Sequence, residues 1–132
     1  KAGFSACKGL STAPFECMLG PILPLGKPGP FSALTLGIGD GKEKAVKLLD
    51  DLKNPILEAA GLLPSTRAPL PHVTVTRARR KAGKSGKLAA LKWLKELVRD
   101  PIPVHVRELA LYTWAEDRTE ARYTIIERIE LK

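Results

Sequence analysis

Two amphipathic segments, each followed by proline, limit the possible folds of this chain more than any other sequence feature. The first begins near Lys42, and its apolar residues recur every three or four positions. Pro55 should end or kink this helix near Asn54, because proline removes an amide donor and clashes with the preceding turn. The second segment runs from Lys87 to Arg99. Each helix needs an apolar surface to pack on, since burial of that face supplies most helical stability.

The segments around these helices alternate in the two-residue period of β-strands. They are Phe15 to Leu23, Phe31 to Ile38, His72 to Ala78, Val104 to Trp114 and Arg122 to Leu131. The last two flank the polar turn AEDRTE, as in an antiparallel hairpin. The order of elements predicts an α+β fold of mainly antiparallel sheets, with the two amphipathic helices packed on the outside.

Composition excludes several classes of protein. The 132 residues are 44% apolar and 27% charged, which fits one globular domain and rules out a long disordered chain. No apolar run approaches the roughly 20 residues that cross a bilayer, and the N-terminus lacks a signal-peptide pattern. We therefore expect a soluble, cytoplasmic protein without a membrane partner. The sequence leaves its oligomeric state open.

Metal and cofactor motifs are missing from the sequence. Cys7, Cys17, His72 and His105 are the only cysteines and histidines, and they lack the paired spacing of a zinc site. The segment GIGDGK differs from a phosphate-binding loop because Glu43 follows its lysine, where that motif has serine or threonine. A turn before a helix is the better interpretation. We expect no metal and no cofactor.

Positive charge is concentrated in one segment. Basic residues outnumber acidic ones by 22 to 14, which gives a net charge of +8, and the stretch from Arg77 to Arg99 contains a single acid. For any one lysine, a solvated helix face is the better explanation. The cluster as a whole favours contact with a phosphate backbone. The expected RNA-backbone patch consists of Arg79, Arg80, Lys81 and Lys84.

The segment PHVTVTR indicates a particular chemistry. Residues two apart on a strand face the same side, so His72 and Thr74 place an imidazole beside a hydroxyl. Such a pair suits proton transfer at a phosphate whose oxygen the hydroxyl holds. By spacing alone, a hydrogen-bonded surface pair is the commoner explanation. Tyr112, Trp114 and Tyr123 are able to stack on a base, although the alternation around Tyr123 favours core packing for that ring.

PHVTVTR also resembles the second H-x-T-x motif of the 2H phosphoesterases, specifically the RNA 2',3'-cyclic phosphodiesterases, also called 2'-5' RNA ligases. PFECMLGPILPL with PFSALTLGIG resembles the two strands before that motif, and LALYTWAEDRTEARYTIIERIEL resembles the closing hairpin. The likeness extends from Pro14 to the C-terminus, and only its H-x-T part is chemically specific. It implies a bilobal fold in which two H-x-T strands face each other across a cleft, without a metal.

The resemblance further implies an activity and residue roles. The enzyme would open a terminal 2',3'-cyclic phosphate of RNA or of a cyclic nucleotide to a 2'-phosphate, and reversible 2'-5' RNA ligation would be a second activity. His72 would be one of two acid/base groups, Thr74 would bind phosphate oxygens, and Arg77 would lie near the phosphate. Strict strand alternation turns Arg77 away from His72, so its role requires a twist or the strand end there.

The chain departs from the family in having one H-x-T motif instead of two. His105 is followed by Val106 and Arg107, and it is expected to face solvent on the closing hairpin. Because the chain begins at Lys1, we expect residues 1–132 to be a single domain, the C-terminal part of a bilobal protein, with the first H-x-T strand before it. The alternatives are a non-catalytic RNA- or nucleotide-binding module and a protein-interaction scaffold of the same fold.

Overall fold

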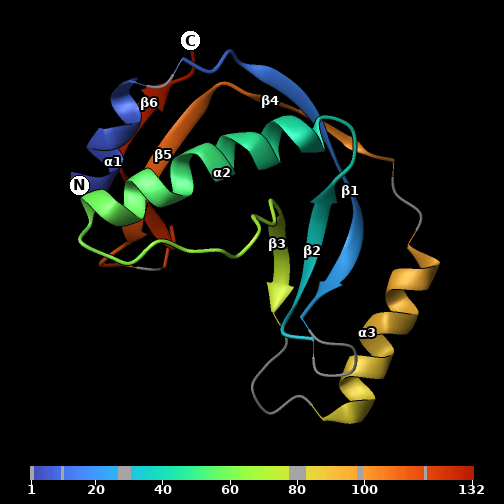
Figure 1. The fold of residues 1–132 in the computed structure, drawn as a ribbon. Helices are drawn as coiled ribbons and strands as arrows, with labels where there is room; N and C mark the ends of the chain where they lie inside the picture. The colour runs from blue at the N-terminus through green and yellow to red at the C-terminus, as the bar shows by residue number, and fades with distance from the viewer. Residues whose placement is uncertain (1, 10, 27–30, 78–82, 98–99, 118) are drawn as a thin grey trace. The chain divides into compact units, whose positions relative to one another are not determined.

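The computed structural model describes residues 2–9, 11–26, 31–77, 83–97, 100–117 and 119–132 (Figure 1). The helical elements are α1 (Ala2–Ser5), η1 (Ala6–Gly9, a 3-10 helix), α2 (Lys42–Ala59) and α3 (Lys84–Glu96). The strands are β1 (Phe15–Leu25), β2 (Ala33–Ile38), β3 (Val73–Arg77), β4 (Ile102–Val106), β5 (Glu108–Trp114) and β6 (Tyr123–Glu130). Within these ranges, no helix has both the length and the apolar character needed to cross a membrane.

The strands form two sheets. The larger has the order β3-β2-β1-β4, and β5 and β6 form a two-stranded sheet. The pairs β1·β2, β2·β3 and β5·β6 are all antiparallel. The predicted α+β class with antiparallel sheets is therefore confirmed.

The predicted strand from Val104 to Trp114 is divided in two, which corrects the expectation for His105. β4 ends at Val106 and β5 begins at Glu108, so the chain changes sheets at this point. His105 consequently lies on β4 in the larger sheet, and not on the closing hairpin. Its side chain is exposed, as predicted.

The chain divides into two compact units. Unit 1 comprises Lys1–Glu16, Glu43–Pro69 and His105–Lys132, and unit 2 comprises Cys17–Lys42 and Leu70–Val104. Each unit has buried apolar side chains of its own. In unit 1 these are Phe4, Cys7, Phe15, Ala45, Leu48, Leu52 and Leu131, and in unit 2 they are Cys17, Phe31, Ala33 and Leu34.

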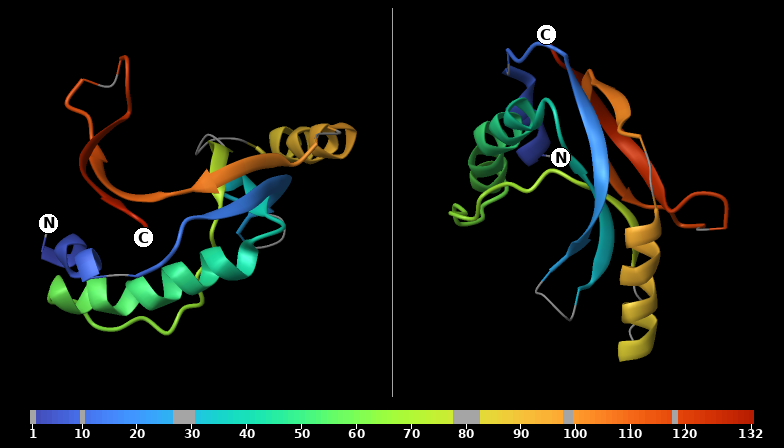
Figure 2. Two further views of the ribbon diagram at one scale, coloured as in Figure 1. Left: turned by 90° about the horizontal axis from the view of Figure 1, so that it is seen from above. Right: turned by 90° about the vertical axis from the view of Figure 1, so that its right-hand side faces the viewer.

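Unit 1 is built around the apolar face of α2. Leu48 and Leu52 are one turn apart and both are buried, so they form the inward stripe of an amphipathic helix. A cavity of 470 Å³ separates α2 from β5, and Phe4 of α1 also lines it. Figure 2 shows α1 next to the C-terminal half of α2. Burial raises the pKa of the Cys7 thiol at this cavity, which disfavours the reactive thiolate.

Pro55 lies inside α2, so the helix does not end near Asn54, which was one of the two predicted outcomes. The helix continues to Ala59, although proline supplies no amide for the carbonyl four residues earlier. The apolar face continues past the proline, because Ile56 lines the same cavity as Leu52. Packing of that face in unit 1 therefore outweighs the local cost of the proline.

Replacing Pro55 with alanine should stabilise the protein by about 1–3 kcal/mol, since it restores a helical hydrogen bond and removes a steric clash. Urea denaturation measures the gain. The control is Pro64→Ala in the exposed loop after α2, where no gain is expected because proline restricts the unfolded chain. A Pro55→Ala protein less stable than the parent would show that the proline fits its site without cost.

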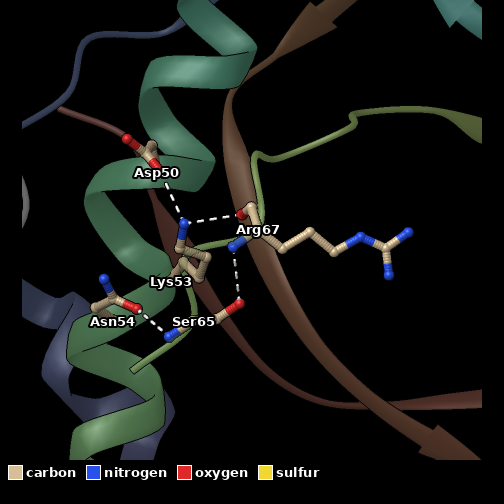
Figure 3. A network of polar contacts seen from close by, with 5 residues as sticks. All are labelled: Asp50, Lys53, Asn54, Ser65 and Arg67. Atoms are coloured by element: carbon tan, nitrogen blue, oxygen red, sulfur yellow. Dashed lines mark hydrogen bonds and ion pairs between the residues drawn. The ribbon is translucent and has the colours of Figure 1, made fainter. Parts of the chain in front are cut away.

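The loop after α2 is attached to the helix by a polar network (Figure 3). Lys53 Nζ donates to Asp50 Oδ1 and to the backbone carbonyl of Arg67, both at 3.0 Å. The Ser65 amide donates to Asn54 Oδ1, also at 3.0 Å. These contacts fix the course of the chain between the end of α2 and the segment that leads to His72.

Unit 2 contains α3, which begins at Lys84, three residues earlier than predicted. Its leucines face the end of β1 across a groove lined by Leu88, Leu91, Leu94, Ile22 and Pro24. None of its described side chains is fully buried. The amphipathic pattern is therefore confirmed, while its apolar face stays partly open.

Candidate functional site

β3 is an edge strand of the larger sheet and begins directly after the predicted catalytic histidine. His72 is exposed, and Thr74 is half-buried at the second position of the strand. Only Val73 lies between them, so the alternation of a strand, continued one residue back from β3, places both side chains on the same side. This face is called the H-x-T face below.

A β-bulge in β3 also brings Arg77 to the H-x-T face. Thr74 lies opposite Thr35 of β2, and Arg77 lies opposite Ala33, so three steps along β3 match two along β2. Directly opposed residues share a face in an antiparallel pair. Thr35 and Ala33 share a face because they are two apart. This bulge is a departure from strict alternation of the kind that a role for Arg77 beside His72 requires.

The imidazole of His72 is held by a backbone carbonyl. Its Nδ1 lies 2.7 Å from the carbonyl oxygen of Leu70. A carbonyl only accepts, so this hydrogen bond requires the proton on Nδ1. The lone pair of the neutral ring is then on Nε2, the nitrogen through which the ring can take up a proton. Leu70 lies between Pro69 and Pro71, and both prolines restrict the backbone that presents this carbonyl.

Thr35 is a supporting residue that the sequence analysis did not identify. It is 3% exposed, and its hydroxyl donates to the carbonyl oxygen of Leu23 at 3.2 Å. This bond satisfies the buried hydroxyl and ties β1 to β2 beside Thr74. Its only sequence signal is a threonine inside the apolar run ALTLGI.

The structure describes only one of the four residues of the expected RNA-backbone patch. Arg79, Arg80 and Lys81 lie outside the described residues. Lys84 is described, and it is exposed as the first residue of α3. Of the other predicted site residues, Thr74 and Arg77 lie on β3, and His72 directly precedes this strand.

His105 has a different environment from His72. Its Nδ1 is hydrogen-bonded to the carboxylate of Glu16, and both residues belong to unit 1, whereas His72 belongs to unit 2. In the part of the chain that the structure describes, no group of three or more histidine, cysteine, aspartate or glutamate side chains could hold a metal ion.

This α+β fold is found in a solved structure described as a phosphoesterase. The two share 20% sequence identity with a TM-score of 0.66, and the likeness covers 98% of this chain and 67% of that chain. At this identity, the comparison establishes the fold. No family model matches the chain, and no curated protein matches it.

Proposed function

We propose that this protein is a phosphodiesterase that opens RNA 2',3'-cyclic phosphates to 2'-phosphates. With an RNA 5'-hydroxyl in place of water, the same ring opening would form a 2'-5' bond, and this ligation would be reversible. The observation that carries the proposal is the orientation of His72, whose Nδ1 is held by the Leu70 carbonyl. This leaves Nε2 for proton transfer on the face that Thr74 and Arg77 share. The phosphoesterase fold and the resemblance of PHVTVTR to an H-x-T-x motif support the same conclusion.

Opening the cyclic ester requires a base and an acid. The base takes a proton from water while the water oxygen bonds to phosphorus. The bond from phosphorus to the 3' oxygen breaks, and the acid protonates that oxygen, which leaves a 2'-phosphate. His72 serves one of these steps through Nε2. We assign the other to the first H-x-T motif that the family resemblance implies, because one imidazole cannot be acid and base in the same step.

Thr74 and Arg77 would hold the charged phosphate. The Thr74 hydroxyl donates a hydrogen bond to a non-bridging oxygen, and the Arg77 guanidinium offsets the negative charge that grows in the transition state. Arg77 is exposed at the end of β3, so its long side chain is able to turn toward a bound phosphate.

Thr74→Val should lower kcat/KM for a 2',3'-cyclic nucleotide roughly 10- to 150-fold, because a hydrogen bond to a charged group contributes about 1.5–3 kcal/mol. Thr74→Ser keeps the hydroxyl and should stay within a few-fold of the parent. The matched control is Thr76→Val, since Thr76 lies opposite Leu34 on the other face. Equal losses for Thr74→Val and Thr76→Val would remove the hydroxyl from the mechanism.

Product analysis tests the proposed reaction directly. The full-length protein is incubated with an RNA oligonucleotide that ends in a 2',3'-cyclic phosphate, and the products are separated and identified by ³¹P NMR. The proposal expects a 2'-phosphate. A 3'-phosphate would reject the assigned bond cleavage, and binding without turnover would favour the non-catalytic RNA-binding module.

A further inference from the structure

Three aromatic side chains form a continuous exposed surface on the β5·β6 hairpin. Tyr112 and Trp114 are two apart on β5, and Tyr123 lies opposite Trp114 on β6, so all three share a face. The ring centroid of Tyr123 lies 4.9 Å from that of Tyr112 and 5.0 Å from that of Trp114. We call this surface the aromatic face.

The aromatic face is separate from the core face of the hairpin. Leu109 and Leu111 alternate with the aromatic positions of β5 and line the cavity beside α2, as does Ala110, whereas none of the three rings lines it. Tyr112, Trp114 and Tyr123 are 59%, 56% and 47% exposed. The expectation that Tyr123 packs in the core is therefore wrong. Within unit 1, the leucines of β5 are half-buried, whereas the rings are exposed to solvent.

The charge around the aromatic face restricts what it can bind. Residues 107–132 contain five basic and six acidic side chains, so the hairpin itself has no positive surplus to attract phosphates. The whole chain carries a charge of +8, which attracts a polyanion and repels a second copy of the chain. A molecule with flat rings and negative charge elsewhere matches both the exposed rings and the positive charge of the chain.

We infer that the aromatic face binds unpaired nucleobases of the RNA whose cyclic end is the proposed substrate. Unpaired bases stack on exposed tyrosine and tryptophan rings with little dependence on base identity, and this contact requires no local positive charge. The inference rests on the proposed function for the choice of RNA. It adds a base-binding surface in unit 1 to the phosphate-binding face in unit 2.

Salt dependence distinguishes base stacking from phosphate binding. The dissociation constant of the full-length protein for a fluorescent single-stranded RNA ending in a 2'-phosphate is measured over a range of salt concentrations. Tyr123→Leu should weaken binding roughly 5- to 150-fold at every salt concentration. The slope of the logarithm of affinity against the logarithm of salt should not change, because that slope counts phosphate contacts.

Matched variants control for loss of folding. Tyr123→Trp keeps a ring and should bind within about twofold of the parent if one stacking surface substitutes for another. Trp93→Leu replaces a comparably exposed ring on α3, which is 46% exposed, and should leave binding unchanged. In a Trp93→Phe protein, Trp114 is the only tryptophan, and its fluorescence should be quenched by the RNA.

Three results would overturn the inference. These are unchanged binding by Tyr123→Leu, a changed salt slope, or an equal loss of affinity for an RNA with abasic residues. A loss that coincides with dissociation of a dimer in sedimentation would assign the aromatic face to a second copy. Failure of this inference can be distinguished from failure of the proposed function by turnover of a cyclic mononucleotide. If the proposed function holds, the Tyr123→Leu protein keeps this turnover, and the turnover is still lost when His72 is replaced.

Discussion

His72→Ala is expected to lower kcat for a 2',3'-cyclic nucleotide by roughly 10²–10⁴-fold, the range that general acid–base catalysis supplies. The stability should change little, because the side chain is exposed and its described hydrogen bond is to the carbonyl of Leu70. Binding of the 2'-phosphate product should persist through Thr74 and Arg77. Steady-state kinetics with urea denaturation of the same proteins separates the two effects.

Two further variants determine which nitrogen of His72 acts. His72→Asn places an amide where Nδ1 was, so it can still donate to the Leu70 carbonyl, but it has no group at the position of Nε2. We expect it to be as inactive as His72→Ala. His105→Ala is the matched control, because His105 is also exposed but its Nδ1 is hydrogen-bonded to Glu16. Substantial turnover by His72→Asn would show that Nε2 does not transfer the proton.

Leu52→Ala should lower the free energy of unfolding by about 2–5 kcal/mol, the range for truncation of a buried leucine. Leu52 is 4% exposed and lines the cavity between α2 and β5. Truncation therefore removes buried apolar contacts and enlarges a space that is already 470 Å³. Leu49→Ala, on the same helix and at the same cavity but 39% exposed, should cost less than about 1 kcal/mol.

The two tryptophans locate this loss within the chain. Trp114 belongs to unit 1, together with Leu52, and Trp93 belongs to unit 2. Urea unfolding of Leu52→Ala is followed by fluorescence in proteins that retain one tryptophan or the other. The transition reported by Trp114 should shift to lower urea concentration. A shift confined to Trp93 would contradict the assignment of Leu52 to the core of unit 1.

Local periodicity predicted most of the helices and strands. Where the structure differs from the prediction, the difference depends on what a segment packs against or pairs with. The alternation in VTVTR and the spacing of leucines in α2 and α3 are properties of single segments, so the sequence is sufficient for them. The continuation of α2 through Pro55 depends on packing of Ile56 at the cavity. The change of sheets between Val106 and Glu108 depends on which strand each segment meets.

The candidate site also has features that the sequence alone predicts and features that depend on the rest of the fold. His72 and Thr74 could be placed together from sequence, since spacing of two along a strand is enough. The position of Arg77 could not, because the bulge is set by the register of β3 against β2. The Leu70 carbonyl that orients the imidazole is a backbone group without a side-chain signal. Arg79, Arg80 and Lys81 remain a prediction from charge alone.

A crystal structure of the full-length protein with a 2'-nucleoside monophosphate tests the central claim most directly. The account predicts the phosphate within roughly 2.6–3.2 Å of both His72 Nε2 and Thr74 Oγ1, with Nδ1 still bonded to the Leu70 carbonyl. A phosphate held by other side chains, with the imidazole and the hydroxyl both turned away from it, would contradict the account.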